Sequence, residues 1–261
     1  MIQTARVSAT ATTPTLKLRG LTKSFGSVQA LRGADFEVRD GEVMALVGDN
    51  GAGKSTLIKC VAGIYSIDDG EVLFEGRPVS IHGPKEAARL GIEVVYQDLA
   101  LCDNLDVVQN MYLGREDHDA LFRLREAPME LRTIETLKSL AVTTIRSVRQ
   151  PVATLSGGQR QSVAVARAVL WNSRVVFLDE PTAALGVAQT RQVLDLVKRL
   201  AEEGLAVVLV SHNLIDVFEV ADRITVLRLG QSVGVYERDR TNEQEIVQAI
   251  TAGTPAKEAS A

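Results

Sequence analysis

The chain has 261 residues, 24% of them charged, and a formal net charge of -4 at pH 7. This length allows one large α/β domain, or a core domain with a smaller lobe, and disfavours two well-separated domains. The charge balance lacks the basic surplus of a dedicated nucleic-acid binder, so nucleic acid is not the expected partner. The longest apolar runs, such as residues 205–210, are far shorter than the ~20 residues that span a bilayer. The N-terminus also lacks the basic start and apolar core of a signal peptide, so we expect a chain that neither crosses a membrane nor is exported.

The N-terminal region combines a tail with extended segments. Residues 1–15 are rich in Thr, Ala and Ser and show no sustained periodicity, which predicts a flexible tail. Alternating residues at 16–19 and an extended piece around 35–38 predict strands. Phe25 lies between them, and an aromatic side chain here either packs into the core or stacks on a nucleotide base.

Residues 48–55 fit the phosphate-loop pattern, in which two glycines separated by four residues precede a Lys and a hydroxyl residue. An apolar run at 43–47 and helical spacing at 56–62 place this loop between a buried strand and a helix. Glycines let backbone N–H groups wrap a triphosphate, and the helix N-terminus faces the anion. We expect Lys54 to place a charge on the outer phosphates and the Ser55 hydroxyl to bind magnesium. The expected nucleotide-binding residues here are Gly48, Asp49, Asn50, Gly51, Ala52, Gly53, Lys54, Ser55 and Thr56.

A hairpin is predicted at residues 71–81, and the next strand, at 91–96, ends at Gln97. An amide at the carboxyl end of a strand is a candidate site residue, although solvation at the surface is the commoner fate of a single Gln. The following residues lose the strand pattern and show the i, i+3, i+4 spacing of amphipathic helices. We place this helical insert at about residues 98–165.

A second candidate phosphate site precedes a breaker-free helical segment. It comprises Ser156, Gly157, Gly158 and Gln159. Ser before two glycines at a helix start leaves unpaired N–H groups at a positive dipole end, which suits phosphate. The same pattern is a common helix cap, so the local sequence leaves both interpretations open.

Two acids end the buried strand at 175–180. Adjacent residues on a strand point to opposite faces, so Asp179 can join a magnesium shell while Glu180 polarises a water aimed at the γ-phosphate. After a helix at about 188–203, the strand at 206–211 leads to His212. A neutral imidazole there could hold the γ-phosphate and the attacking water, and a structural role is the alternative.

The C-terminal part is predicted to form a hairpin through Gly230, a short helix at 242–250 and a charged, Ala-rich flexible tail at 253–261. No internal repeat is visible, which indicates one nucleotide-binding module over residues 16–252. The fold class is therefore α/β: a P-loop NTPase core with a mainly parallel sheet, an N-terminal antiparallel β subdomain and an inserted α-helical subdomain.

The chain resembles the ATP-binding subunit of an ATP-binding-cassette (ABC) transporter over about residues 16–250. The resemblance is carried, in this order, by the phosphate loop, Gln97, the segment at 155–159, the Asp179-Glu180 pair and His212. The resemblance implies an ATPase coupled to transport, with ATP and Mg²⁺ as its ligands. Phe25 would stack on adenine. Gln97 would sense magnesium and the attacking water, Glu180 would be the catalytic base, and His212 would have its functional role rather than the structural one. The implied metal ligands are Ser55, Gln97 and Asp179.

The family works as a head-to-tail dimer, which implies that Ser156 and its glycines face the ATP held by the partner's Lys54. The helical insert would receive a coupling helix from a membrane permease. This implies a peripheral protein at the cytoplasmic face of the inner membrane, linked indirectly to a solute-binding protein. One departure is Gly186, which stands where the family usually has Asp and removes a carboxylate expected at the dimer seam.

Residues 96–100 and 110–116 are similar to the branch that serves monosaccharide importers, such as those for ribose, xylose or fructose. This implies import of a monosaccharide by a transporter with two copies of the chain. A soluble ABC ATPase of DNA repair or translation is the alternative, and such proteins usually carry twin cassettes, a long coiled coil or basic extensions. A P-loop kinase is a third hypothesis, and it leaves the Ser156 segment without a use.

Overall fold

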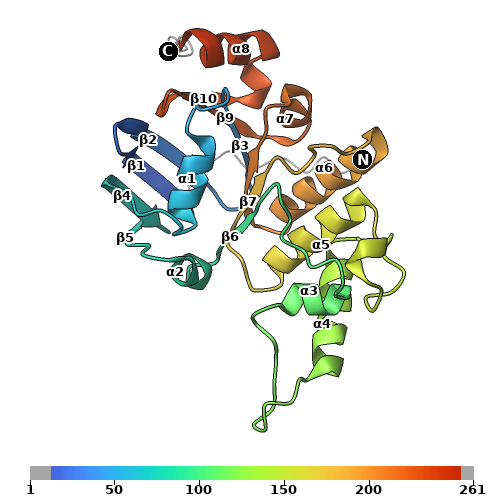
Figure 1. Cartoon of the computed structure of the whole chain (residues 1–261). Helices are drawn as coiled ribbons and strands as arrows, with labels where there is room; N and C mark the ends of the chain where they lie inside the picture. The colour runs from blue at the N-terminus through green and yellow to red at the C-terminus, as the bar shows by residue number, and fades with distance from the viewer. Residues whose placement is uncertain (1–12, 254–261) are drawn as a thin grey trace.

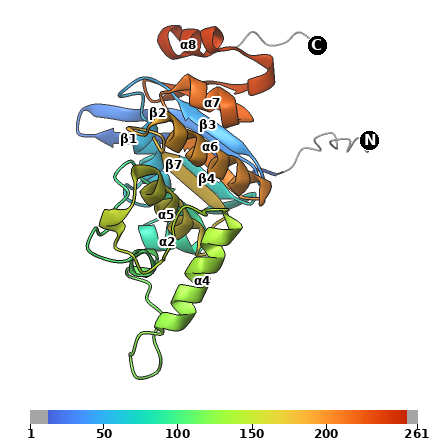
Figure 2. The same cartoon turned by 90° about the vertical axis from the view of Figure 1, so that its right-hand side faces the viewer.

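The computed structural model describes residues 13–253 of the chain (Figures 1 and 2). Most of both predicted tails lies outside the described residues. Thr15, which the sequence assigned to the N-terminal tail, is buried and donates its backbone N–H to the Val38 carbonyl oxygen over 2.9 Å. Gly253, assigned to the C-terminal tail, ends the last helix in the left-handed region. Thr15 and Gly253 are therefore both held by the folded domain. Within the described part of the chain, no helix is long and apolar enough to cross a bilayer.

The described strands form two sheets (Figure 1). The smaller sheet is antiparallel, with its strands in the order β2-β1-β4-β5, and it confirms the predicted antiparallel subdomain. The first strand continues to Phe25, although the alternation seen at residues 16–19 is broken by register shifts after Leu18. The strands are β1 (Leu16–Phe25), β2 (Val28–Val38), β4 (Asp69–Phe74) and β5 (Arg77–Val79).

The larger sheet has the strand order β10-β9-β3-β8-β7-β6. All neighbours are parallel except β10 and β9, which form the predicted closing hairpin. Parallel strands covered on both faces need continuous apolar runs, which is the pattern of this sequence. The strands are β3 (Val43–Val47), β6 (Ile92–Val95), β7 (Val175–Asp179), β8 (Ala206–Val210), β9 (Arg223–Arg228) and β10 (Gln231–Glu237).

Each central strand contributes to two cores because its side chains alternate between the faces. In β3, Met44 and Leu46 pack with α1 (Lys54–Val61) and the small sheet, whereas Ala45 and Val47 pack with the helices on the other face. Figure 1 shows α1 between the small sheet and the central sheet. The central sheet is therefore covered on both sides, and its carboxyl ends are the edge at which α1 begins.

Helices fill the segment between β6 and β7, as predicted, and the helix at residues 126–139 projects away from the central sheet in both views (Figures 1 and 2). They are α3 (Val107–Tyr112), α4 (Glu126–Ser139), the 3-10 turn η1 (Val152–Thr154) and α5 (Gly157–Val169). The remaining helical elements are α2 (Pro84–Arg89), α6 (Val187–Glu202), α7 (Leu214–Val220), η2 (Arg238–Arg240) and α8 (Glu243–Ala252). The sequence did not predict α2 and α7, because six and seven residues are too few to show a helical period.

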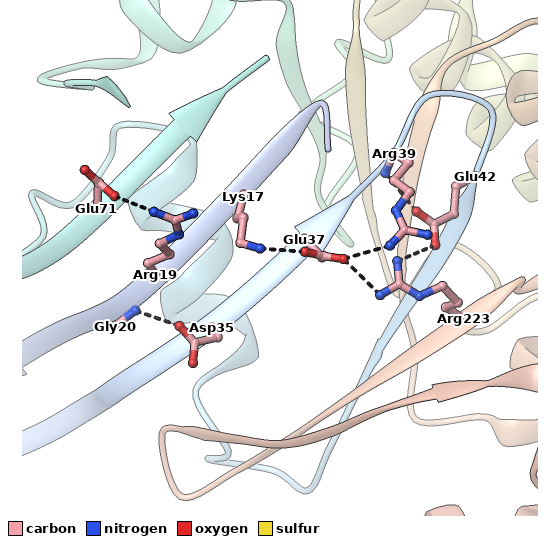
Figure 3. A network of polar contacts seen from close by, with 9 residues as sticks. All are labelled: Lys17, Arg19, Gly20, Asp35, Glu37, Arg39, Glu42, Glu71 and Arg223. Atoms are coloured by element: carbon pink, nitrogen blue, oxygen red, sulfur yellow. Dashed lines mark hydrogen bonds and ion pairs between the residues drawn. The ribbon is translucent and has the colours of Figure 1, made fainter. Parts of the chain in front are cut away.

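An ionic network joins the small sheet to the starts of β3 and β9 (Figure 3). The carboxylate of Glu37 accepts hydrogen bonds from Lys17, Arg39 and Arg223 over 3.0–3.2 Å. The Arg223 guanidinium also donates to Glu42 over 3.1 Å, and both of these side chains are about 90% buried. Burial raises the pKa of Glu42, only partly opposed by the charge of Arg223. The network lies at the opposite end of β3 from the phosphate loop.

Glu37 is expected to make stability depend on acidity. Burial alone would raise its pKa, but hydrogen bonds from Lys17 and Arg223 outweigh it and lower the pKa below 4.5. A carboxyl whose pKa is lower in the folded chain stabilises it above the unfolded pKa, and this contribution is lost as the pH falls through the folded pKa. In urea unfolding, Glu37→Gln should therefore be less stable than the wild type at about pH 6, with the difference shrinking towards about pH 3. A difference that stays constant with pH would contradict this linkage.

Candidate functional site

The loop between β3 and α1 needs glycine where it packs on neighbouring backbone. Gly48 has a φ of 154°, and a Cβ atom there would lie 2.1 Å from the Leu227 carbonyl oxygen of β9. Gly53 has a φ of 106°, and its Cβ would lie 2.8 Å from the Ala30 carbonyl oxygen of β2. The sequence predicts that the glycines let the backbone wrap a triphosphate. At these two positions, the close approach of the chain's own backbone is already a sufficient reason for glycine.

Lys54 begins α1 and folds back over the loop. Its ammonium group donates to the carbonyl oxygens of Gly48 over 2.6 Å and of Asp49 over 3.1 Å. Burial lowers the pKa of Lys54, and the charges of Glu180 and Asp179 oppose that shift. Lys54 is thus the one charged residue in the first turn of α1, and its cation faces two carboxylates. This arrangement suits the phosphates and the metal ion of a nucleotide.

A cavity of about 520 Å³ connects the phosphate loop with the predicted acids. It collects residues from the ends of three central strands and from β2, so segments far apart in the sequence meet at one edge of the sheet. Its lining includes every predicted loop residue except Gly48, and it also contains Gln97, Asp179 and Glu180. This is the arrangement expected at the carboxyl edge of a parallel sheet.

The two acids after β7 are in different environments. Asp179 has a raised pKa, first because of burial and then because of the charge of Glu180, with Lys54 opposing both. Glu180 has a φ of 51°, and its backbone N–H donates to the Val210 carbonyl oxygen over 2.9 Å. A non-glycine residue in the left-handed region costs about 1–3 kcal/mol, and such strain is concentrated at functional sites. The left-handed backbone at Glu180 therefore turns the chain away from the direction of β7.

His212 reaches the site through Glu180. Its Nδ1 atom lies 2.8 Å from Oε2 of Glu180, whose side chain is only 16% exposed. His212 does not line the larger cavity. It lines an adjacent one of about 230 Å³, together with Gly48, Asn50 and Ile250 of α8. The predicted catalytic pair is therefore in direct contact, with the carboxylate facing the phosphate loop.

A second contact joins the segments that follow these two residues. The Thr182 hydroxyl donates to Oδ2 of Asp216 over 2.6 Å, and Asp216 is 5% exposed in the first turn of α7. Together with the Glu180 bonds, this contact fixes the turn after β7 against the turn after β8. Asp216 could not be predicted from the sequence, because an Asp in a short amphipathic segment carries no signal of burial.

Phe25 lies apart from the cavity lining. Its ring is 43% exposed and packs edge-on against Tyr65, with the ring centroids 5.0 Å apart. The lining near β2 consists instead of residues that the sequence analysis missed, because no motif marks them. They are Val28, Gln29, Ala30 and Arg32 of β2, and Leu229 from the β9–β10 turn.

Ser156 is the N-cap of α5. Its hydroxyl accepts from the Gln159 backbone N–H over 3.3 Å, and the Gln159 side chain accepts from the Ser156 N–H over 2.9 Å. Gln159 also donates to the Thr144 carbonyl oxygen. This capping box satisfies two orphan donors within one chain. The segment does not line the cavity of its own chain, and its role as a phosphate site remains a prediction.

The donor set fits Mg²⁺. Ser55, Gln97 and Asp179 line the same cavity and offer a hydroxyl, an amide and a carboxylate oxygen. Hard oxygen donors suit Mg²⁺, which usually binds through one or two carboxylates and completes its shell with phosphate oxygens and water. No group of three or more His, Cys, Asp or Glu within residues 13–253 could hold a metal ion. Ser55, Gln97 and Asp179 therefore have the donor atoms that Mg²⁺ prefers.

The fold and the site together define a P-loop nucleotide-binding cassette, with a helical insert beside the central sheet. The family model of the ABC transporter matches residues 31–183, and the chain belongs to this family.

The curated relatives include sugar import proteins. The chain is 47% identical to the fructose import ATP-binding protein FrcA of Rhizobium meliloti, covering 95% of this chain and 98% of that protein. It is 45% identical to the xylose/arabinose import ATP-binding protein XylG of Sulfolobus acidocaldarius, covering 90% and 93%. The ribose import ATP-binding protein RbsA of Yersinia pestis is 43% identical over 91% of this chain, which spans 46% of the length of RbsA.

Solved structures agree with the fold. A nucleotide-free ATP-binding cassette from an ABC transporter has a TM-score of 0.78 and 25% identity, covering 92% of this chain and 95% of that one. The dimeric structure of a bacterial ABC transporter cassette has a TM-score of 0.72 and 26% identity, covering 85% and 98%. The sequence-based prediction of the fold class and family is thus confirmed.

Proposed function

We propose that the chain is the ATP-binding and ATP-hydrolysing subunit of an ABC importer for a monosaccharide. The observation that carries the proposal is the placement of Glu180. Its carboxylate contacts His212 and lines one cavity with the phosphate loop and Asp179. A site that only bound nucleotide would not need a strained acid directed at the loop.

Each group of site residues has its own role in binding or hydrolysis. The loop N–H groups and Lys54 bind the β- and γ-phosphates, and the N-terminus of α1 faces the same anion. Ser55, Gln97 and Asp179 would hold Mg²⁺, which when bound neutralises charge that develops on the phosphates. Glu180 orients a water and accepts its proton, while His212 holds the carboxylate in place. Phe25, which is exposed beside Tyr65, stacks on adenine.

The active unit is a head-to-tail homodimer. Ser156, Gly157 and Gly158 would present the N-terminus of α5 to the nucleotide bound by the partner subunit, with Gln159 keeping the helix start in shape. The dimeric structure of a related cassette supports this assembly. A membrane permease would bind the helical insert, which projects from the central sheet (Figure 2). The chain would then lie at the cytoplasmic face of the inner membrane and serve a solute-binding protein indirectly.

The cargo is proposed from the relatives. Fructose, xylose/arabinose and ribose import proteins are 43–47% identical to the chain over 90% or more of its length. The cassette itself does not touch the cargo in this account, so the sugar class rests on that similarity. Two copies of the chain would serve one transporter.

A product assay tests the proposal. The purified chain with Mg²⁺ and ATP should release free phosphate, and a permease of a sugar importer in lipid should raise the rate. A small-molecule kinase would instead transfer the phosphate to an acceptor, and a soluble cassette ATPase would be stimulated by DNA or ribosomes. Either of these results would overturn the proposed function.

A further inference from the structure

The turn between β9 and β10 carries a residue that its backbone disfavours. The turn has two residues, Leu229 with a φ of 48° and Gly230 with a φ of 81°. Two-residue hairpins with positive φ at both positions prefer Asn, Asp or Gly at the first position. Leu costs roughly 1–2 kcal/mol in this conformation. The backbone of the turn itself therefore does not explain a leucine at this position.

The turn is fixed against the phosphate loop. The backbone N–H of Gly230 donates to the Ala52 carbonyl oxygen over 2.9 Å, and the Arg32 N–H donates to the Gly230 carbonyl oxygen over 2.8 Å. A Cβ atom at Gly230 would lie 2.7 Å from the Ala30 carbonyl oxygen, so the turn presses directly on β2. The position of Leu229 relative to the loop is consequently set by main-chain contacts.

The Leu229 side chain is exposed but faces the cavity. It is 59% exposed and lines the cavity that contains the phosphate loop. Val28 of β2 lines the same cavity and is 64% exposed. Exposed apolar side chains in a cavity gain free energy when an uncharged ligand surface covers them, whereas they gain little from a phosphate. The apolar surface that a nucleotide offers is its base and ribose.

We propose that Leu229 is a nucleoside-contacting residue, which packs with Val28 on the base and ribose of the bound nucleotide. The strain at position 229 is then offset by apolar surface buried only in the complex. This inference rests on the proposed function, since it assigns one more contact to the same nucleotide site.

The Leu229→Asn variant removes the proposed apolar contact while keeping the backbone conformation of the turn. Asn fits the backbone, so the variant should melt at a temperature equal to or above that of the wild type. Calorimetric titration with a non-hydrolysable ATP analogue should give a Kd about fivefold to tenfold higher. Titration with inorganic tripolyphosphate should give an unchanged Kd, because tripolyphosphate has no nucleoside. Leu229→Gly should behave in the same way.

The β4–β5 turn supplies a matched control. Glu75 has a φ of 49° and precedes Gly76, with a φ of 77°, in another two-residue hairpin. Glu75 does not line the cavity, and its ion pair with Arg174 is about half exposed. Glu75→Asn should leave the Kd values of both ligands unchanged.

The outcomes are distinguishable. If Leu229→Asn binds the analogue as tightly as the wild type, the contact does not exist. If it weakens the analogue and tripolyphosphate equally, Leu229 acts by positioning the phosphate loop, and the inference is wrong. A wild-type chain that binds neither ligand would instead overturn the proposed function itself.

Discussion

Glu180→Gln is expected to lower kcat for ATP hydrolysis about 100- to 10,000-fold, which is the usual contribution of general acid–base catalysis. Gln has nearly the same size and can still reach Nδ1 of His212, which lies 2.8 Å from the carboxylate. It cannot take a proton from water. Binding of ATP should persist, because the phosphates are held by the loop and by Lys54.

The variant also removes a negative charge beside Asp179. Since the charge of Glu180 is the second cause of the raised pKa of Asp179, that pKa should fall toward its ordinary value. Binding of Mg²⁺ with ATP should therefore be retained or improved. Single-turnover kinetics separate hydrolysis from binding. Glu219→Gln is a suitable control, because this exposed carboxylate of α7 pairs with Lys198 over 3.4 Å, and its loss should leave kcat unchanged. Wild-type turnover in Glu180→Gln would show that another group is the base.

Lys54→Ala is expected to raise the Kd for ATP about 10- to 100-fold, the range of a lost hydrogen bond to a charged group. The ammonium lies over the loop and faces Asp179 and Glu180, so its loss also leaves these acids less compensated against the phosphates. The melting temperature should change little, because the lost bonds in the free chain are two contacts to loop carbonyls.

Lys85→Ala provides the control for Lys54→Ala. Lys85 is exposed in α2, outside the cavity lining, so its loss changes net charge equally without touching the loop. Fluorescence titration with a labelled ATP analogue measures both variants. An unchanged affinity in Lys54→Ala would contradict the assignment of the phosphate loop.

Much of the site could be predicted from sequence because the phosphate loop and the acids lie at the ends of apolar strands. The strand before Asp179 and the strand before His212 read as continuous buried runs, and they pair side by side as β7 and β8. Since parallel strands align their carboxyl ends, residues that follow them must converge. The contact between Glu180 and His212 is the result.

Other features left no readable pattern. Val28 and Leu229 line the cavity because β2 and the β9–β10 turn press on the loop, and neither residue belongs to a motif. The burial of Asp216 depends on a partner, Thr182, that lies in another element. Such tertiary contacts cannot be found from local periodicity. The helices α2 and α7 were not predicted because they are too short to show a helical period.

Gly186 stands where the family usually has Asp, and its position in the structure is well defined. It is the N-cap of α6 and makes no side-chain cap, and a Cβ atom there would meet nothing within 4 Å. The fold therefore leaves room for the Asp that the family usually has at this position. Its absence in this chain does not disturb the cavity, from which Gly186 is separate.

We propose that two copies of the chain enclose each triphosphate, one with its phosphate loop and the other with the start of α5 at Ser156. Light scattering of Glu180→Gln with Mg²⁺ and ATP measures this directly. We expect the mass of a dimer with ATP and of a monomer with ADP, and we expect Ser156→Arg, added to this variant, to abolish the dimer while ATP still binds. A Glu180→Gln chain that stays monomeric with ATP, even with its permease present, or a dimer that Ser156→Arg leaves intact, would contradict it.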